Sequence, residues 1–104
     1  MKISRLRELA KKQGFYSNRP LSESSNEDNY IYCCLLNRWL IESYQISVSV
    51  DNDDVGYNWE TRDHYRRVVP LFSDSYCTRY DSAFVEGLME TIKYINKKNY
   101  DKGR

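Results

Sequence analysis

The chain has 104 residues, 40% of them hydrophobic and 30% charged, and its formal net charge is +1 at pH 7. This length suits one domain with one modest core, and the ten tyrosines and two tryptophans exclude a solvating, disordered tail. No apolar run approaches the roughly 20 residues needed to span a bilayer, and the charged first residues do not resemble a signal peptide. We therefore expect a single domain over residues 1–104 in the cytoplasm, without a membrane partner.

The cysteines argue against disulfides and against a zinc site. They are Cys33, Cys34 and Cys77, an odd number in a chain without a secretion signal, so free thiols are expected. Structural zinc sites space their paired ligands two to four residues apart, and adjacent cysteines cannot easily reach one metal. A site built from these cysteines and His64, the only histidine, is disfavoured, and we expect no metal and no cofactor.

A short helix is predicted at the start of the chain. Its apolar residues recur at helical spacing, and they are Ile3, Leu6, Leu9 and Ala10. Gly14 stands where a helix would end. The following residues, 17–29, are rich in Ser, Asn and acidic residues and have no apolar period, which predicts a flexible loop.

A second helix is predicted over residues 30–44, packed on a sheet. One face of it is apolar, and the residues on that face are Cys33, Leu36, Leu40 and Tyr44. After this helix the hydrophobic period changes to two, because Ile46, Val48 and Val50 alternate with polar residues. The change of period predicts a strand with one core face.

The first strand is expected to return as a hairpin. The Asn and Asp residues of 51–54 supply turn chemistry, and 55–62 is the predicted partner strand. A third strand is predicted over 64–72, where Pro70 must end the strand or hold it at a sheet edge.

The final element is a long amphipathic helix from about Arg79 to Lys97 or Lys98. Its apolar residues are Phe84, Leu88, Ile92 and Ile95. Gly87 lies in the middle of this helix, where it costs about 1 kcal/mol relative to Ala, so we expect a close approach to the sheet or to a neighbouring helix. The predicted class is α+β: a short N-terminal helix, then α-β-β-β-α, with a small antiparallel sheet packed by helices on one face.

No catalytic motif is present in the sequence. The segment DNDDVG (51–56) is similar to the opening of a calcium loop, but Val55 and Arg62 occupy positions that should carry oxygen ligands. A Gly-rich phosphate loop, HExxH and GxSxG are all missing. We expect a protein that is not an enzyme. A small enzyme built around His64 remains an alternative if acidic groups converge on it in a pocket.

Charge is distributed unevenly. Residues 1–20 carry six basic residues and one acidic residue, and residues 51–63 carry five acidic residues and one basic residue. The two regions either neutralise one another, in the fold or across a dimer, or bind a partner. The order helix, three strands, helix is that of double-stranded RNA-binding domains, but Asp81 lies where those domains carry a lysine cluster. The candidate residues for binding a macromolecule are Arg5, Lys12, Tyr65, Arg66 and Arg67.

Four stretches, taken in order, resemble a group of small bacteriophage, prophage and gut or marine bacterial proteins. They are AKKQGF (10–15), LLNRWLIESYQISVSV (35–50), Trp59 and YDSAFVEGLMETIKYI (80–95). The chain departs from the group's pattern at Asp81-Ser82, which replaces an acidic pair, and at Tyr44-Gln45, which replaces a His-Asn turn. The resemblance implies a mobile-element origin and an α+β fold. It implies no activity, and no functional residues carry over.

The number of tyrosines exceeds what so small a core can hold, so several are expected on the surface, where Tyr and Arg often dominate binding interfaces. We expect a non-enzymatic phage or mobile-element protein that binds, and inhibits, a larger host protein or assembly in the bacterial cytoplasm. The alternative is a nucleic-acid-binding accessory protein that uses a basic N-terminal helix. Monomer and homodimer are both compatible with the sequence.

Overall fold

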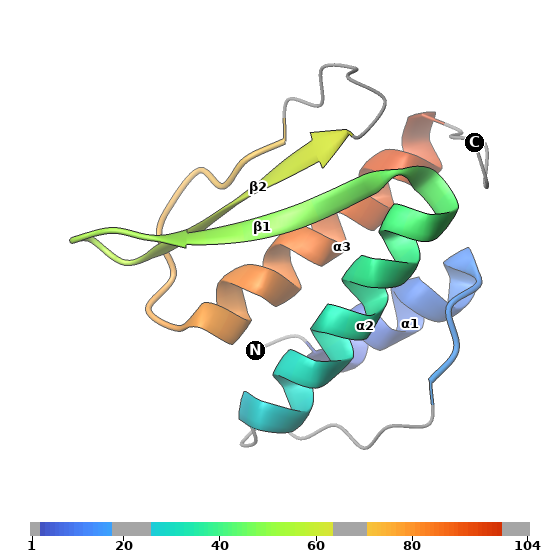
Figure 1. Ribbon diagram of the computed structural model, residues 1–104, viewed down its shortest axis with the longest axis horizontal. Coiled ribbons are helices and arrows are strands. Elements are labelled where there is room, and N and C mark those ends of the chain that lie inside the picture. Colours follow the sequence, from blue (N-terminus) through green and yellow to red (C-terminus); the bar gives the residue numbers. More distant parts are fainter. Residues whose placement is uncertain (1–2, 18–25, 64–70, 99–104) are drawn as a thin grey trace.

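The computed structural model describes residues 3–17, 26–63 and 71–98. The elements are, in chain order, α1 (Ile3–Gln13), α2 (Asn26–Tyr44), β1 (Ile46–Asn52), β2 (Tyr57–Asp63) and α3 (Tyr80–Lys98) (Figure 1). The α+β class predicted from the sequence is confirmed. Helices were expected at both ends and before the first strand, and the structure has them there.

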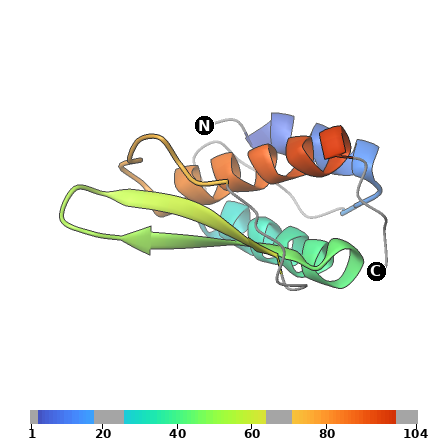
Figure 2. The same ribbon diagram turned by 90° about the horizontal axis from the view of Figure 1, so that it is seen from above.

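Helix α3 is the centre of the fold, because it contacts α1, α2, β1 and β2. One face of the β1–β2 hairpin lies on α3, and α2 runs beside the hairpin and contacts β1 (Figure 1). Helix α1 packs on α3 on the side away from the hairpin (Figure 2). The core therefore lies around α3, and none of the described helices covers the second face of the hairpin.

The hairpin has the alternation that the sequence predicts. The two strands pair antiparallel, with Val48 opposite Thr61 and Val50 opposite Trp59. Val48 and Trp59 are buried against α3, whereas Glu60 on the other face is exposed. A period of two thus places apolar side chains toward α3 and polar side chains toward solvent.

The predicted third strand is not confirmed. Residues 64–70 lie outside the described part of the chain, and the sheet formed by the described residues has two strands, β1 and β2. Residues 71–77, which we name the crossing segment, instead run antiparallel beside β2 with isolated bridges at Phe72 and Cys77. Ser73 bonds to Trp59, and Cys77 bonds to Tyr57. The two bonded positions thus lie four residues apart on the crossing segment, whereas they lie two residues apart on β2. The middle of the crossing segment therefore bulges outward, and its pairing with β2 is not a regular ladder.

The predicted loop over 17–29 is too long at its C-terminal end, because α2 already begins at Asn26. Glu27 and Asp28 lie in the first turn, where the helix dipole favours negative side chains. The polar residues 26–29, which the sequence predicted to be part of the loop, form the first turn of α2. Residues 18–25 lie outside the described part of the chain, and the flexibility predicted for them stays a prediction.

The close approach expected at Gly87 is confirmed. A Cβ atom at this position would lie 2.7 Å from Cγ1 of Val48 and 3.0 Å from the ring of Trp59, closer than van der Waals contact allows. The hydroxyl group of Thr91 donates a hydrogen bond of 2.7 Å to the Gly87 carbonyl within the helix. Glycine thus lets α3 and the hairpin pack at a distance that alanine would prevent.

Candidate functional site

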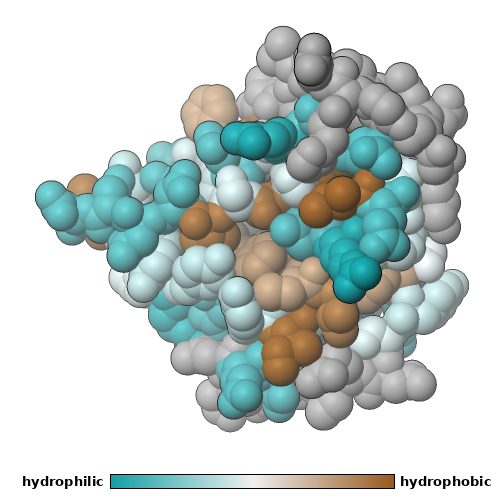
Figure 3. Space-filling model, in the orientation of Figure 1, coloured by the Kyte–Doolittle hydropathy of each residue, from teal (hydrophilic) through white to brown (hydrophobic). Residues whose placement is uncertain are grey.

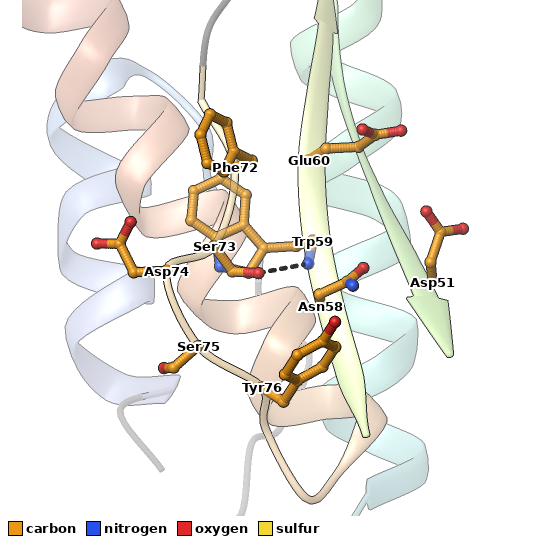
Figure 4. Close-up of a pocket in the computed structure, with 9 residues that line it drawn as sticks. All are labelled: Asp51, Asn58, Trp59, Glu60, Phe72, Ser73, Asp74, Ser75 and Tyr76. Carbon is orange, nitrogen blue, oxygen red and sulfur yellow. Dashed lines mark hydrogen bonds between the residues drawn. The ribbon is translucent and has the colours of Figure 1, made fainter. Parts of the chain in front are cut away.

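A pocket of about 420 Å³ lies on the solvent face of the hairpin, where the crossing segment passes β2 (Figure 4). We name it the acidic pocket. The residues that line it come from β1, β2 and the crossing segment, and they are Asp51, Asn58, Trp59, Glu60, Phe72, Ser73, Asp74, Ser75 and Tyr76. Three of the nine are carboxylates, and none is basic.

Two aromatic side chains are exposed at the acidic pocket. Phe72 has 66% of its surface exposed and Tyr76 has 45%. Phe72 and Glu60 form one of the two isolated bridges, so these two residues lie opposite each other on the crossing segment and β2. The acidic pocket therefore combines an exposed apolar ring with a lining that contains three carboxylates, and a partner protein could cover both.

The wall of the acidic pocket is held by hydrogen bonds to Trp59. The backbone N–H of Trp59 donates to Oγ of Ser73 at 3.2 Å (Figure 4), and its indole N–H donates to Oε1 of Glu86 at 3.2 Å. The thiol of Cys77 donates to Oε2 of Glu86 at 3.6 Å. Burial raises the pKa of Cys77, and the negative charge of Glu86 adds to the increase. Glu86 therefore connects α3 to both β2 and the crossing segment.

The hairpin turn beside the pocket is ordered by Asp53. Its carboxylate accepts hydrogen bonds from the backbone N–H groups of Val55 at 2.8 Å and Gly56 at 3.2 Å. The bond from Val55 is the main reason that the pKa of Asp53 lies below its ordinary value. Tyr76 also bonds to Asp53, and this bond raises the pKa of the Tyr76 hydroxyl group. The turn chemistry read from the sequence is confirmed.

A second hollow, of about 390 Å³, continues the acidic surface toward α3. It shares Trp59, Phe72 and Asp74 with the acidic pocket and adds Glu86 and Glu90 from α3. Phe72 stands between the two hollows. The acidic surface therefore extends from β1 across the crossing segment to α3, with one exposed apolar ring near its centre.

A third hollow, of about 470 Å³, has a different character and lies at the start of α3. We name it the tyrosine groove, and it is lined by Glu27, Tyr30, Tyr57, Thr78, Arg79, Tyr80 and Asp81. The ring of Tyr80 is central, because its centroid lies 5.6 Å from that of Tyr30 and 5.8 Å from that of Tyr57. Three elements far apart in the sequence each contribute one tyrosine.

Two of the five residues that the sequence proposed for binding lie in the described part of the chain. Arg5 and Lys12 are exposed on α1, and Arg5 forms an ion pair of 3.3 Å with Glu8. The other three proposed residues, at 65–67, lie outside the described part of the chain, as does the only histidine.

The sequence did not identify Phe72 as an exposed residue of a pocket: the HYRRVVPLF stretch was interpreted to contain a strand, and Phe72 was left open between a dimer contact and a core position. The signal that could have found it is the polar stretch that follows, SDS, which cannot continue a core strand. A bulged segment over a strand edge exposes apolar residues that a regular strand would bury.

Within the described residues, no helix combines the length and apolar composition needed to cross a lipid bilayer. The same residues contain no group of three or more His, Cys, Asp or Glu side chains placed to hold a metal ion. Comparisons with protein-family models, with curated proteins and with solved structures give no match for this chain. The basis for a functional proposal is therefore the geometry of these surfaces.

Proposed function

We propose that this protein is a non-enzymatic binding protein that docks its acidic pocket onto a basic surface of a larger protein. One observation carries the proposal: Phe72, 66% exposed, lines the same pocket as the carboxylates of Asp51, Glu60 and Asp74. A partner that covers this surface would bury the phenyl ring and pair the acidic rim with Lys or Arg side chains.

The two parts of the surface have different physical roles. Burial of an exposed aromatic ring contributes directly to affinity, and a residue of this kind can account for 2 kcal/mol or more at an interface. Carboxylates at the rim contribute less to affinity, but they speed up the encounter with a basic partner and select against acidic ones. An apolar centre within a charged rim is the usual arrangement of protein interfaces.

We also propose a biological setting for this binding. The partner is a host protein or assembly in the bacterial cytoplasm, and this chain, of mobile-element origin, inhibits it by covering its basic surface. Support comes from the acidic surface itself, since basic surfaces in a cell are commonly those that bind phosphates or nucleic acid. Occupying such a surface would block its normal ligand.

Nucleic-acid binding through α1 has less support. Two of the basic residues of α1 already have partners within the fold: Arg5 pairs with Glu8, and the guanidinium group of Arg7 lies 5.2 Å from the centroid of the Tyr32 ring. Lys11 and Lys12 stay exposed at the end of the helix. Phosphate contacts through these lysines stay a prediction, and a steep loss of binding with added salt would identify them.

The test of the proposed function is capture of a partner from bacterial lysate by the tagged protein, with nuclease present, compared across variants. Phe72→Ala and Glu60→Lys are expected to lose the partner. Val55→Ala is the matched control, because Val55 is 72% exposed at the hairpin tip and does not line the acidic pocket. A partner retained equally by wild type and Phe72→Ala, or lost from wild type on nuclease treatment, would overturn the proposal.

A further inference from the structure

The outer edge of β1 carries backbone groups that β2 does not use. In the register of the hairpin, Thr61 and Trp59 of β2 bond to the crossing segment, so their opposite residues, Val48 and Val50, point their N–H and C=O groups away from β2. The backbone groups of Asn52 also point away from β2, because the opposite residue, Tyr57, bonds to Cys77 of the crossing segment. These three residues therefore define the free edge of the sheet.

One position of this edge is closed from within the protein. The side-chain amide of Asn37, on α2, donates to the Val48 carbonyl at 3.0 Å and accepts from the Val48 N–H at 2.8 Å. Among the described residues, none makes the equivalent hydrogen bonds to Val50 or Asn52. The edge is therefore open over the distal half of β1, and Asn37 marks where the open part begins.

The open edge lies beside the tyrosine groove. Asn52 is directly opposite Tyr57, which lines the groove. Burial is the main cause of the raised pKa of Tyr80, and the charges of Cys34 and then Asp51 add to it. Strand β1 and helix α2 diverge from their junction, and α3 runs behind them (Figure 1). Apolar surface crosses the middle of this face, bordered by hydrophilic surface (Figure 3). The exposed residues on the α2 side include Tyr30 and Leu35.

Acidic side chains lie at both the open edge of β1 and the tyrosine groove. Glu27 lines the tyrosine groove, and Asp51 is exposed on β1 next to the open edge. The one basic residue that lines the groove, Arg79, is held by both oxygens of Asp81 at 3.1 and 2.8 Å. The lining therefore offers the carboxylate of Glu27 and tyrosine ring faces, the two kinds of group that attract a Lys or Arg side chain.

We propose that the open edge of β1 and the tyrosine groove together bind an extended, basic segment of another protein. The segment adds to β1 as a strand through the N–H and C=O groups of Val50 and Asn52, and a Lys or Arg of the segment lies over Tyr30 or Tyr80, near Glu27. Asn37 fixes the register, because its amide blocks the next backbone position. This site lies at the other edge of the hairpin from the crossing segment, shares only Asp51 with the acidic pocket, and does not rest on the proposed function.

A second copy of this chain fits the edge poorly. A two-fold axis at Val50 would pair Asn52 with Val48 of the other copy, where the amide of Asn37 already occupies the edge. An axis at Asp51 would place two carboxylates directly opposite each other, about 5 Å apart between Cβ atoms, which is destabilising. The charge around the groove therefore selects a partner of opposite sign.

The test uses the full chain and a synthetic seven-residue peptide that alternates Arg with Val, titrated to millimolar concentration and followed by the backbone amide signals of the protein. Binding is expected to shift the signals of Val50 and Asn52. The same peptide with N-methylated alternate amides cannot form the strand, and an alternating Glu and Val peptide has the wrong charge, so neither should bind. Absence of any shift with the Arg peptide would overturn the proposal.

Three variants separate the parts of the site. Val50→Pro removes an outward N–H at an edge where proline is tolerated, and it should abolish binding. Tyr80→Ala should weaken binding by about tenfold through loss of the cation–π contact. This variant also tests the site if Val50→Pro does not fold. Tyr16→Ala, which removes a tyrosine that is 75% exposed and does not line the groove, should bind as wild type does.

The acidic pocket provides the remaining control. Phe72→Ala is expected to leave peptide binding at β1 unchanged, because Phe72 lies on the other side of β2 from β1. Shifts that centre on Glu60 and Asp74 instead of Val50, or a Val50→Pro variant that folds and binds as well as wild type, would show that the peptide uses the acidic pocket and that the edge is not a site.

Discussion

The side chain of Asn37 forms two hydrogen bonds with the backbone of Val48, one to its carbonyl group and one from its N–H group. In this position the amide acts as a peptide group would in a neighbouring strand. It fastens α2 to β1 and satisfies two backbone groups that would otherwise face a helix.

The first prediction concerns this contact. Asn37→Leu keeps the size of the side chain but leaves the N–H and C=O of Val48 without partners, so the free energy of unfolding should fall by about 1 to 3 kcal/mol. Denaturant unfolding at neutral pH measures the change. Asn96→Leu, at an exposed position of α3, is the control and should stay within about 0.5 kcal/mol of wild type. An equal effect of both variants would assign the loss to something other than the Val48 contact.

The second prediction concerns Gly87. Alanine in a helix interior is better than glycine by about 1 kcal/mol, but a Cβ here would overlap Val48 and Trp59. Overpacking typically costs about 1 to 3 kcal/mol, so after the helix gain Gly87→Ala should lower the free energy of unfolding by up to about 2 kcal/mol. Thermal or denaturant unfolding will show it. A stabilised Gly87→Ala variant would mean that α3 does not approach the hairpin this closely.

The third prediction concerns pH and the hairpin turn. The pKa of Asp53 is lowered in the folded protein from its ordinary value of 3.8. The stability that its carboxylate contributes is therefore present above that value and is lost as the pH falls through the folded pKa. Asp53→Asn keeps the hydrogen-bonding shape without the charge. Wild type should be the more stable of the two at neutral pH, and the difference should disappear at strongly acidic pH.

Unfolding of both proteins across a pH series provides the measurement, since the other acidic groups are common to both and cancel in the difference. A difference that grows on acidification would contradict the assignment of the lowered pKa to Asp53.

The fourth prediction concerns Cys77. Burial and the charge of Glu86 raise its pKa, so little of it is thiolate at pH 8. Glu86→Gln removes the charge and should speed alkylation of Cys77 by iodoacetamide, measured at that residue by peptide mass spectrometry. Glu90→Gln, an exposed residue one turn further along α3, should leave the rate unchanged. Equal rates in wild type and Glu86→Gln would show that the contact with Glu86 does not control the thiol.

Local patterns were enough to predict much of this fold. The alternation of Ile46, Val48 and Val50 identified the buried face of β1, and the position of Gly87 identified the close packing of α3. Both features depend on residues close together in sequence or on one unusual residue. Both can be predicted without knowing which element packs against them.

The features that were missed depend on pairing between distant segments. The bulge that exposes Phe72 exists because Ser73 and Cys77 bond to two residues of β2, and no period in the crossing segment reports this. The tyrosine groove needs three elements to converge. The early start of α2 was missed for another reason: acidic and amide side chains are common both in loops and in the first turn of a helix.

The central position of α3 has a consequence for how the chain folds. Every other described element packs on a helix that follows all of them in sequence, and the contacts between α1 and α3 join the two ends of the described chain. Before α3 is available, the hairpin and α2 can form only with their apolar faces uncovered. Such long-range closure slows folding, so assembly of the core should be late and cooperative, and the nascent protein should depend on protection from aggregation until α3 docks.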